Sequence, residues 1–128
     1  MIDIAQFRPT GTCFDDALDF VSELLAASTG DAKLRWIQQL IIVHGICITP
    51  DGEPYAHAWV EHLEKVWQGT LLQGQRAFYP TQREKFYEER RVMESTRYTV
   101  REAMRMNEQH DNFGPWEERY LRLVLPRR

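Results

Sequence analysis

The sequence has few cysteines, no long apolar run and no clustered basic segment. Only two cysteines, Cys13 and Cys47, occur among 128 residues, and nothing in their positions requires a disulfide, so we expect both thiols to be reduced. The longest aliphatic run covers residues 40–43, far short of the roughly 20 residues that span a bilayer. We therefore expect no transmembrane segment and no membrane partner.

Short motifs for metals and phosphates are also missing. The chain has no CxxC, no HExxH and no glycine-rich phosphate loop, which are common signatures of zinc and nucleotide sites. Its four histidines do not stand at the spacings of paired zinc ligands. The sequence therefore predicts neither a metal site nor a cofactor.

Charge is divided unevenly along the chain but is not concentrated. Residues 1–82 carry a net charge of −5 and residues 83–128 one of +2, which gives −3 in total. Basic and acidic residues are interspersed in the second part, unlike the clustered basic face of a nucleic-acid-binding protein. We expect no nucleic-acid partner. The first six residues have neither a basic start nor an apolar stretch, so we expect no secretory signal and a cytoplasmic location.

A helix is predicted near the start of the chain. Thr12 suits the N-cap position, and Asp15 three residues later completes a capping-box pattern. Apolar residues then recur at helical spacing, at positions 14, 17, 18, 21, 24 and 25, and form one stripe. Gly30 is expected to end this helix, since glycine readily adopts the left-handed conformation.

The middle of the chain is predicted to form strands. Residues 37–48 are apolar and rich in β-branched side chains, and a turn with proline and glycine follows over residues 49–54. A second strand over residues 55–63 is expected to return antiparallel, with Tyr55, His57, Trp59 and Glu61 on one face. A further short strand is expected to begin at residues 65–67, before a loop.

The last third is predicted to be more helical. Capping boxes over residues 81–84 and 99–102 predict helices over 85–90 and 103–109. Residues 92–98 between them are expected to form an edge strand, and residues 116–125 either a last helix or an extended tail. Because no linker or low-complexity segment interrupts the chain, we expect a single α+β domain over residues 1–128.

Cys13 is expected to lie in the first turn of the predicted helix, where a thiolate finds favourable surroundings. Unpaired backbone N–H groups and the helix dipole stabilise negative charge there, and the same amides can hold the oxyanion of an acyl-transfer intermediate. The carboxylates of Asp15 and Asp16 oppose this effect and favour the neutral thiol. The alternative interpretation is a small, buried core cysteine.

His57 is a candidate general base on the second strand of the hairpin. Imidazole has an ordinary pKa near ~6.5, so it can accept and return a proton near neutral pH. A strand also holds such a group more rigidly than a loop does. The alternative interpretation is a histidine with a structural role.

The order of these elements resembles that of papain-like and transglutaminase-like cysteine hydrolases. The segment GTCFDDAL at residues 11–18 is similar to their nucleophile helix start, and HAWVE at residues 57–61 is similar to their histidine strand. The chain looks most like small uncharacterised bacterial and phage-type proteins with this core. The resemblance covers residues 10–70 best. It implies that a helix bearing Cys13 packs on a small antiparallel sheet, with extra helices in the C-terminal third.

The resemblance also implies two supporting residues. The family usually orients its histidine with an Asp or Asn on the next strand, and the matching position here is occupied by Gln68. A glutamine carbonyl can accept a hydrogen bond from Nδ1–H of the imidazole, but it lacks the charge that stabilises imidazolium. Gln6, upstream of the cysteine, is the candidate for completing the oxyanion hole.

The resemblance implies a cysteine-dependent hydrolase or acyl transferase that acts on an amide, isopeptide or thioester bond. Cys13 would be the nucleophile and His57 the proton acceptor, oriented by Gln68, and the substrate would be a protein or a peptide-like molecule. Three tryptophans are candidate walls of the substrate cleft or ordinary core residues: Trp59, Trp67 and Trp116. The alternative is a catalytically inactive binding or regulatory protein of the same fold, which the missing Asp or Asn favours.

Overall fold

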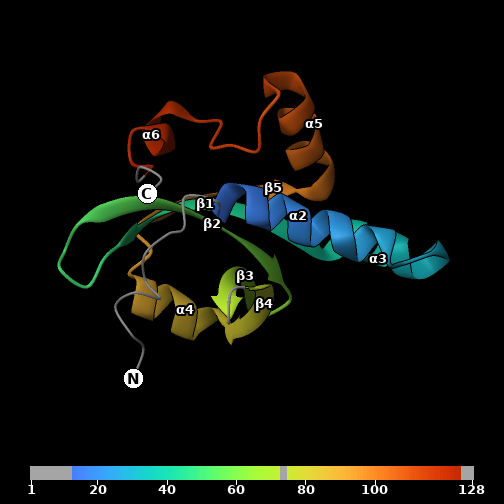
Figure 1. The fold of residues 1–128 in the computed structure, drawn as a ribbon, viewed down its shortest axis with the longest axis horizontal. Helices are drawn as coiled ribbons and strands as arrows, with labels where there is room; N and C mark the ends of the chain where they lie inside the picture. Colours follow the sequence, from blue (N-terminus) through green and yellow to red (C-terminus); the bar gives the residue numbers. More distant parts are fainter. Residues whose placement is uncertain (1–12, 73–74, 125–128) are drawn as a thin grey trace.

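The computed structural model describes residues 13–72 and 75–124, and helices and strands are mixed along the chain (Figure 1). The elements follow one another in this order: α2 (Cys13–Ala26), α3 (Gly30–Gln39), β1 (Leu40–Ile48), β2 (Pro54–His62), β3 (Lys65–Leu72), β4 (Gln75–Gln82), α4 (Arg83–Arg90), β5 (Glu94–Thr99), α5 (Val100–His110) and α6 (Glu118–Leu121). The fold is therefore a mixed α+β fold, which confirms this part of the prediction.

The strands form one five-stranded antiparallel sheet in the order β4-β3-β2-β1-β5. β1 and β2 are the predicted hairpin, paired from Leu40 opposite His62 to Ile48 opposite Pro54. β5 pairs with the outer side of β1 and lies at one edge of the sheet, as the sequence predicted for residues 92–98. The hairpin is thus the centre of the sheet.

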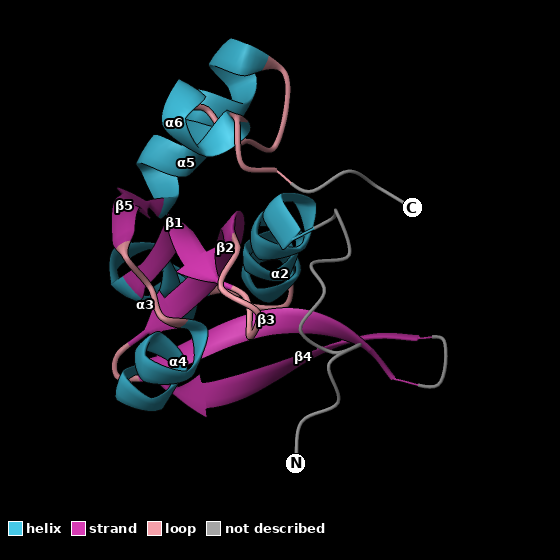
Figure 2. Ribbon diagram, turned by 90° about the vertical axis from the view of Figure 1, so that its left-hand side faces the viewer, coloured by secondary structure: helices cyan, strands magenta, loops and turns pink. Residues whose placement is uncertain are grey.

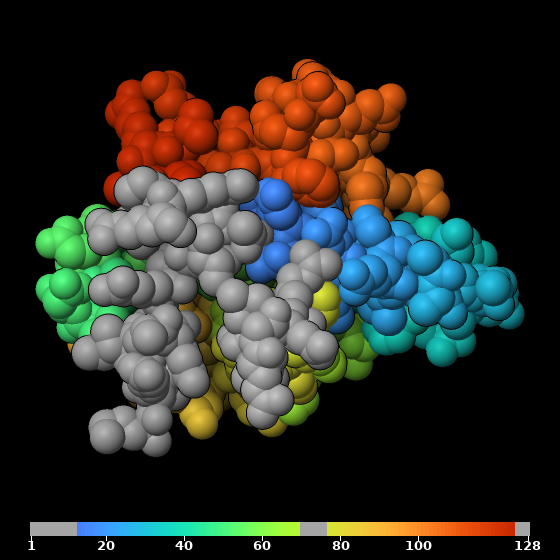
Figure 3. Space-filling model, in the orientation of Figure 1, coloured from blue at the N-terminus to red at the C-terminus, as the bar shows by residue number. Residues whose placement is uncertain are grey.

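The two faces of the sheet carry separate hydrophobic cores. On one face, α2, α5 and α6 cover Leu40, Ile42 and Val60. On the other face, Phe86 of α4 packs on Trp59. Figure 2 shows α2 and α4 on different sides of the strands, and Figure 3 shows the C-terminal residues, in orange and red, as a layer along α2. The predicted alternation of β2 is confirmed, because Ala56, Ala58 and Val60 belong to the α2 side and Tyr55 and Trp59 to the α4 side.

The sequence did not predict two elements of the fold, α3 and β4. The predicted first helix is confirmed as α2, but a second helix, α3, follows at Gly30, so the strand begins at Leu40 rather than at Ile37. No side chain of α3 is buried, which explains why it has no continuous apolar stripe. The loop expected after residue 67 is also partly wrong, since β3 runs to Leu72 and β4 returns from Gln75.

The two predicted capping boxes have different outcomes. Thr99 caps α5, because its side chain accepts from the amide of Glu102 at 3.1 Å while the Glu102 side chain accepts from the amide of Thr99 at 3.0 Å. The prediction of a capping box at residues 81–84 is wrong. Thr81 is a β4 residue that pairs with Val66, and the N-cap of α4 is Gln82, whose side chain makes no capping bond.

Replacing Thr99 by alanine is expected to lower the free energy of unfolding by about 1 kcal/mol, since the amide of Glu102 loses the Thr99 hydroxyl as its acceptor. The measurement is urea unfolding followed by circular dichroism. Thr99→Ser is the matched control, because serine caps helices at least as well as threonine. Equal losses for the two variants would contradict a capping role.

Within the described part of the chain, no helix has both the length and the apolar character that crossing a membrane requires.

Candidate functional site

The first turn of α2 brings Cys13 to an open edge of β2. β1 pairs with β2 along the whole strand, whereas β3 pairs with it only at Val60, Glu61 and His62. Before Val60, the outer edge of β2 therefore has no strand partner among the described residues. The backbone amide of Ala58 lies on this edge and donates a hydrogen bond to the sulfur of Cys13. The start of the helix thus takes the place that a neighbouring strand would occupy.

Two further contacts hold this arrangement. The amide of Ala56, two residues before Ala58 on the same edge, donates to the carbonyl of Leu123 at 2.8 Å. On the other side of the helix start, a Cβ at Gly69 of β3 would lie only 3.0 Å from Oδ2 of Asp16. Glycine at this position lets the first turn of α2 approach β3 closely. The first turn of α2 therefore contacts two strands, β2 through Cys13 and β3 through Asp16.

The thiol of Cys13 is neutral in this environment. It is 8% exposed, and burial raises its pKa to about 12, because a thiolate loses its hydration when it is taken out of water. The amide of Ala58 lowers the pKa, the negative charge of Asp16 raises it, and the amides of Phe14 and of Cys13 itself lower it. The effects expected from the helix start and from Asp16 are thus both present, but desolvation outweighs them.

His57 forms a hydrogen-bonded chain with β3 and β4. Its Nε2 lies 2.9 Å from Oε1 of Gln68, and Nε2 of Gln68 donates to the hydroxyl of Tyr79 at 2.7 Å. With the amide nitrogen directed to Tyr79, the glutamine oxygen faces His57, so Nε2 of His57 carries the proton. The other ring nitrogen, Nδ1, then has a free lone pair.

This second nitrogen has no hydrogen-bond partner although it is buried. Nδ1 of His57 is one of three buried side-chain polar atoms without a partner in the described part of the molecule. The pKa of His57 is lowered to about 4, because burial and charge repulsion from Arg90 lower it more than the bond to Gln68 raises it. The imidazole is therefore neutral near pH 7, in the form that accepts a proton. A buried, unsatisfied nitrogen of this kind is uncommon in folded proteins and calls for an explanation.

The structure brings the predicted residues near one another without joining them all. Gln68 contacts His57 as the sequence reading expected, although through Nε2 and not through Nδ1. Cys13 is bonded to the residue that follows His57, but no hydrogen bond connects the Cys13 sulfur with the His57 ring, since Nδ1 has no partner. Gln6 and Thr12 lie outside the described residues.

The three tryptophans do not gather around one cleft. Trp59 is fully buried under Phe86 on the α4 side. Trp116 packs against His44 and Tyr98 on the α2 side of the sheet. Trp67 stacks on Phe20 with ring centroids 5.4 Å apart. Each of them therefore contributes to local packing in a different part of the fold.

Two residues near His57 were not found from the sequence. Tyr79 belongs to β4, a strand that the sequence analysis did not predict. Arg90 stands at the end of α4, is 9% exposed and donates to the hydroxyl of Tyr55 at 3.1 Å. A charged residue in a mixed-charge helix normally indicates a surface position, so its burial depends on a tertiary contact that no local pattern shows.

Comparison with known proteins leaves the family open. No family model, no curated protein and no solved structure significantly matches this chain. Among the described residues, no group of three or more histidine, cysteine or acidic side chains is arranged to hold a metal ion. The interpretation of the site therefore depends on its own geometry.

Proposed function

We propose that this protein is a cysteine-dependent hydrolase or acyl transferase with a papain-like core. Cys13 is the nucleophile, His57 is the general base and Gln68 orients His57. The bond attacked is an amide, isopeptide or thioester bond in a protein or a peptide-like substrate. No cofactor takes part in this chemistry.

The observation that carries the proposal is the state of His57. Its Nε2 is held by Gln68 at 2.9 Å, Gln68 is held in turn by Tyr79, and Nδ1 is left buried with a free lone pair. Holding one ring nitrogen through a side chain of fixed orientation leaves the other available as a base, which is the logic of a catalytic triad. Both nitrogens of His44 are also buried without a partner, but His57 differs from His44 because a side chain holds one of its two nitrogens in a fixed orientation.

The position of Cys13 supports the same assignment. Its sulfur is bonded to the amide of Ala58, the residue next to His57, and the amides of Cys13 and Phe14 are directed at it as well. These donors stabilise negative charge wherever it forms near the sulfur, either on the thiolate or on an oxyanion. For proton transfer the thiol must exchange the Ala58 amide for the ring of His57, which lies beside Phe86 on the α4 side, whereas Cys13 packs with the core on the α2 side.

The proposed reaction has two steps. The Cys13 thiol gives its proton to Nδ1 of His57 while the sulfur attacks the substrate carbonyl, forming an S–C bond and an oxyanion. The oxyanion collapses, the bond to the leaving group breaks, and the proton on His57 passes to that leaving group. Water or an amine then attacks the acyl group on Cys13 and loses its proton to His57. The S–C bond breaks, the product leaves, and His57 returns this proton to the sulfur, which restores the free thiol.

A second candidate function is a non-catalytic binding or regulatory protein. Burial raises the pKa of the Cys13 thiol to about 12 and lowers that of His57 to about 4, so this state contains no thiolate–imidazolium pair. Gln68 also lacks the carboxylate charge that would favour imidazolium. In this alternative, Cys13 and His57 serve packing alone.

An acyl-transfer assay separates the two candidates. The protein is mixed with p-nitrophenyl acetate at pH 7.5, nitrophenolate release is followed, and acetylated peptides are identified by mass spectrometry. We expect an acetyl group on Cys13 and not on Cys47, which is also a buried cysteine and whose pKa burial also raises to about 12. His57→Gln is expected to lower the acetylation rate by a factor of about 10² or more, because the general base is lost.

Cys47→Ala is the matched control and is expected to leave the rate within about twofold of the parent, since Cys47 packs on the α4 side with Tyr55 and Phe86 and has no part in the proposed site. Circular dichroism confirms that each variant is folded. Slow acetylation of both cysteines at the same rate, or an unchanged rate in a folded His57→Gln variant, would leave the non-catalytic alternative.

A further inference from the structure

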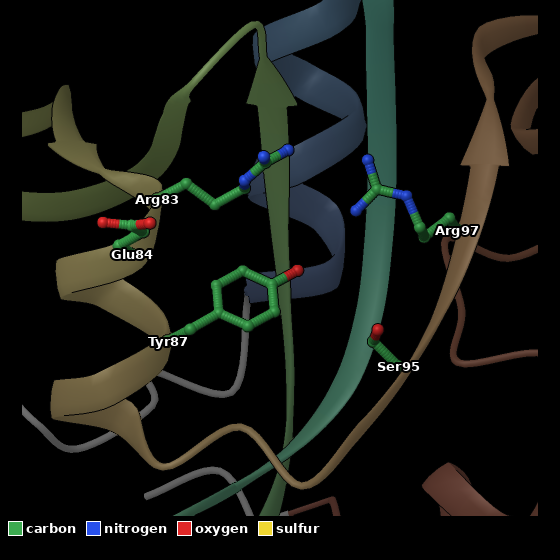
Figure 4. A pocket seen from close by; sticks show the side chains of 5 residues that line it. All are labelled: Arg83, Glu84, Tyr87, Ser95 and Arg97. Carbon is green, nitrogen blue, oxygen red and sulfur yellow. The ribbon is translucent and has the colours of Figure 1, made fainter.

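A hollow on the α4 side of the sheet is lined by side chains that favour an anion. It has a volume of about 420 Å³ and lies between α4 and β5, lined by Arg83, Glu84, Tyr87, Ser95 and Arg97. In Figure 4, Arg83 and Tyr87 reach from α4 and Arg97 reaches from β5 toward the same space, whereas the carboxylate of Glu84 does not. Two guanidinium groups and a phenol hydroxyl therefore converge from two separate elements.

Both arginines share one buried counter-ion. Glu61 of β2 is 1% exposed, and its Oε1 lies 2.8 Å from Nη1 of Arg97 and 3.7 Å from Nη1 of Arg83. One carboxylate thus faces two guanidinium groups, and the side chains of both arginines are nearly half exposed to solvent. Arg83, Arg97 and Glu61 together therefore carry one positive charge in excess, and the carboxylate of Glu84, which also lines the hollow, is directed away from them.

Most of the hydrogen-bond donors of this cluster are unused. A guanidinium group has five N–H donors, but within the described residues the side-chain hydrogen bonds of the pair are those of Arg97 with Glu61 and Tyr87. The remaining donors lie beside one another around the hollow, and the two like charges repel. An anion placed between them would accept these donors and reduce the repulsion, and arginine is the side chain best suited to bind oxyanions through paired bonds.

We propose that this hollow binds a small molecule through an oxyanion group, that is, a carboxylate or a phosphate. Arg83 and Arg97 contact the oxyanion, and Ser95 supplies a further hydroxyl at the wall of the hollow. The volume exceeds that of the anionic group alone, so the rest of the ligand packs along the ring of Tyr87. This site does not depend on the chemistry proposed for Cys13 and His57.

Anion titrations monitored by NMR test the proposal and separate the two sources of oxyanion. Inorganic phosphate and succinate are added separately to ¹⁵N-labelled protein at constant ionic strength, and amide shifts are followed. We expect at least one of them to give saturable shifts that centre on Tyr87, Ser95 and Arg97. Arg83→Gln is expected to weaken that binding at least tenfold. This variant spares Glu61, which keeps its bonds from Trp59, Tyr87 and Arg97.

Two further variants make the result decisive. Arg105→Gln removes the same charge from an exposed position on α5 and is expected to leave the affinity within twofold of the parent. Ser95→Asp places a carboxylate in the hollow itself, so it is expected to abolish binding of both anions without unfolding the protein. The proposal would be overturned if neither anion saturates, if Arg105→Gln weakens binding as much as Arg83→Gln does, or if Ser95→Asp binds like the parent.

Discussion

Replacing Glu61 by alanine is expected to lower the free energy of unfolding by about 3 to 5 kcal/mol, one of the two largest effects expected for this protein. The carboxylate of Glu61 accepts from the indole of Trp59 at 2.9 Å, from the hydroxyl of Tyr87 and from Arg97 at 2.8 Å. Burial raises the pKa of Glu61, but these three donors outweigh burial and lower it. Alanine removes the acceptor, so the fully buried indole N–H of Trp59 has no partner.

Two companion variants separate charge from shape. Glu61→Gln keeps the volume and one acceptor oxygen, so we expect a loss of about 1 to 3 kcal/mol. Glu89→Ala removes an acid of α4 whose only side-chain partner among the described residues is Lys85 at 3.9 Å, and we expect a change within about 0.5 kcal/mol. Chemical denaturation followed by tryptophan fluorescence measures all three. A loss below 1 kcal/mol for Glu61→Ala would show that this cluster does not stabilise the fold.

The contrast between α2 and α3 shows which elements the sequence could predict. α2 has an apolar stripe whose residues Phe14, Ala17, Leu18 and Val21 are all buried, so the pattern and the packing agree. α3 buries none of its residues, and its C-terminal part, with Ile37, reads as the beginning of the apolar strand. Periodicity reports burial on one face, and it fails where a helix is only partly covered.

The candidate site shows a similar limit. The positions of Cys13 at a helix start and of His57 on a strand follow from local patterns, since capping and alternation are local. The hydrogen bond between His57 and Gln68 depends on the separation of β3 from β2 beyond the pair formed by Val60 and Trp67. The burial of Arg90 depends on the packing of α4 against the sheet. Both are properties of tertiary structure. The strong desolvation of Cys13 and His57 also comes from tertiary structure. For this reason, the position of Cys13 at a helix start could not by itself predict the direction of the shift in its pKa.

Acidification from pH 7 to pH 5 is expected to cost the folded state about 4 kcal/mol, the second large effect. Burial lowers the pKa of His44 to about 3, and burial together with Arg90 lowers that of His57 to about 4. An unfolded chain binds a proton at each histidine near pH 6.5. The stability contributed by the neutral rings is therefore present above pH 6.5 and is lost as the pH falls toward 4, at about 2 kcal/mol for each ring by pH 5.

His44 is the better residue for a test, because it does not belong to the hydrogen-bonded chain of His57, Gln68 and Tyr79. Its ring is fully buried, neither nitrogen has a partner in the described structure, and it is enclosed by Phe14, Tyr98 and Trp116 with centroid distances of 4.7 to 5.1 Å. A leucine of similar volume fits such apolar surroundings without orphaned polar atoms. His44→Leu is therefore expected to be at least as stable as the parent at pH 7 and to remove about half of the loss at pH 5.

The slope of the unfolding free energy against pH measures this directly, because each proton taken up on unfolding contributes about 1.36 kcal/mol per pH unit. Between pH 6 and pH 4.5 the two buried histidines account for a slope near two protons, and His44→Leu is expected to reduce it by one. His110→Leu is the control, since His110 is exposed at the end of α5 and its substitution leaves the buried rings untouched. If His44→Leu and the parent had the same slope, His44 would be protonated in the folded state, and its aromatic enclosure would then have to accommodate a cation.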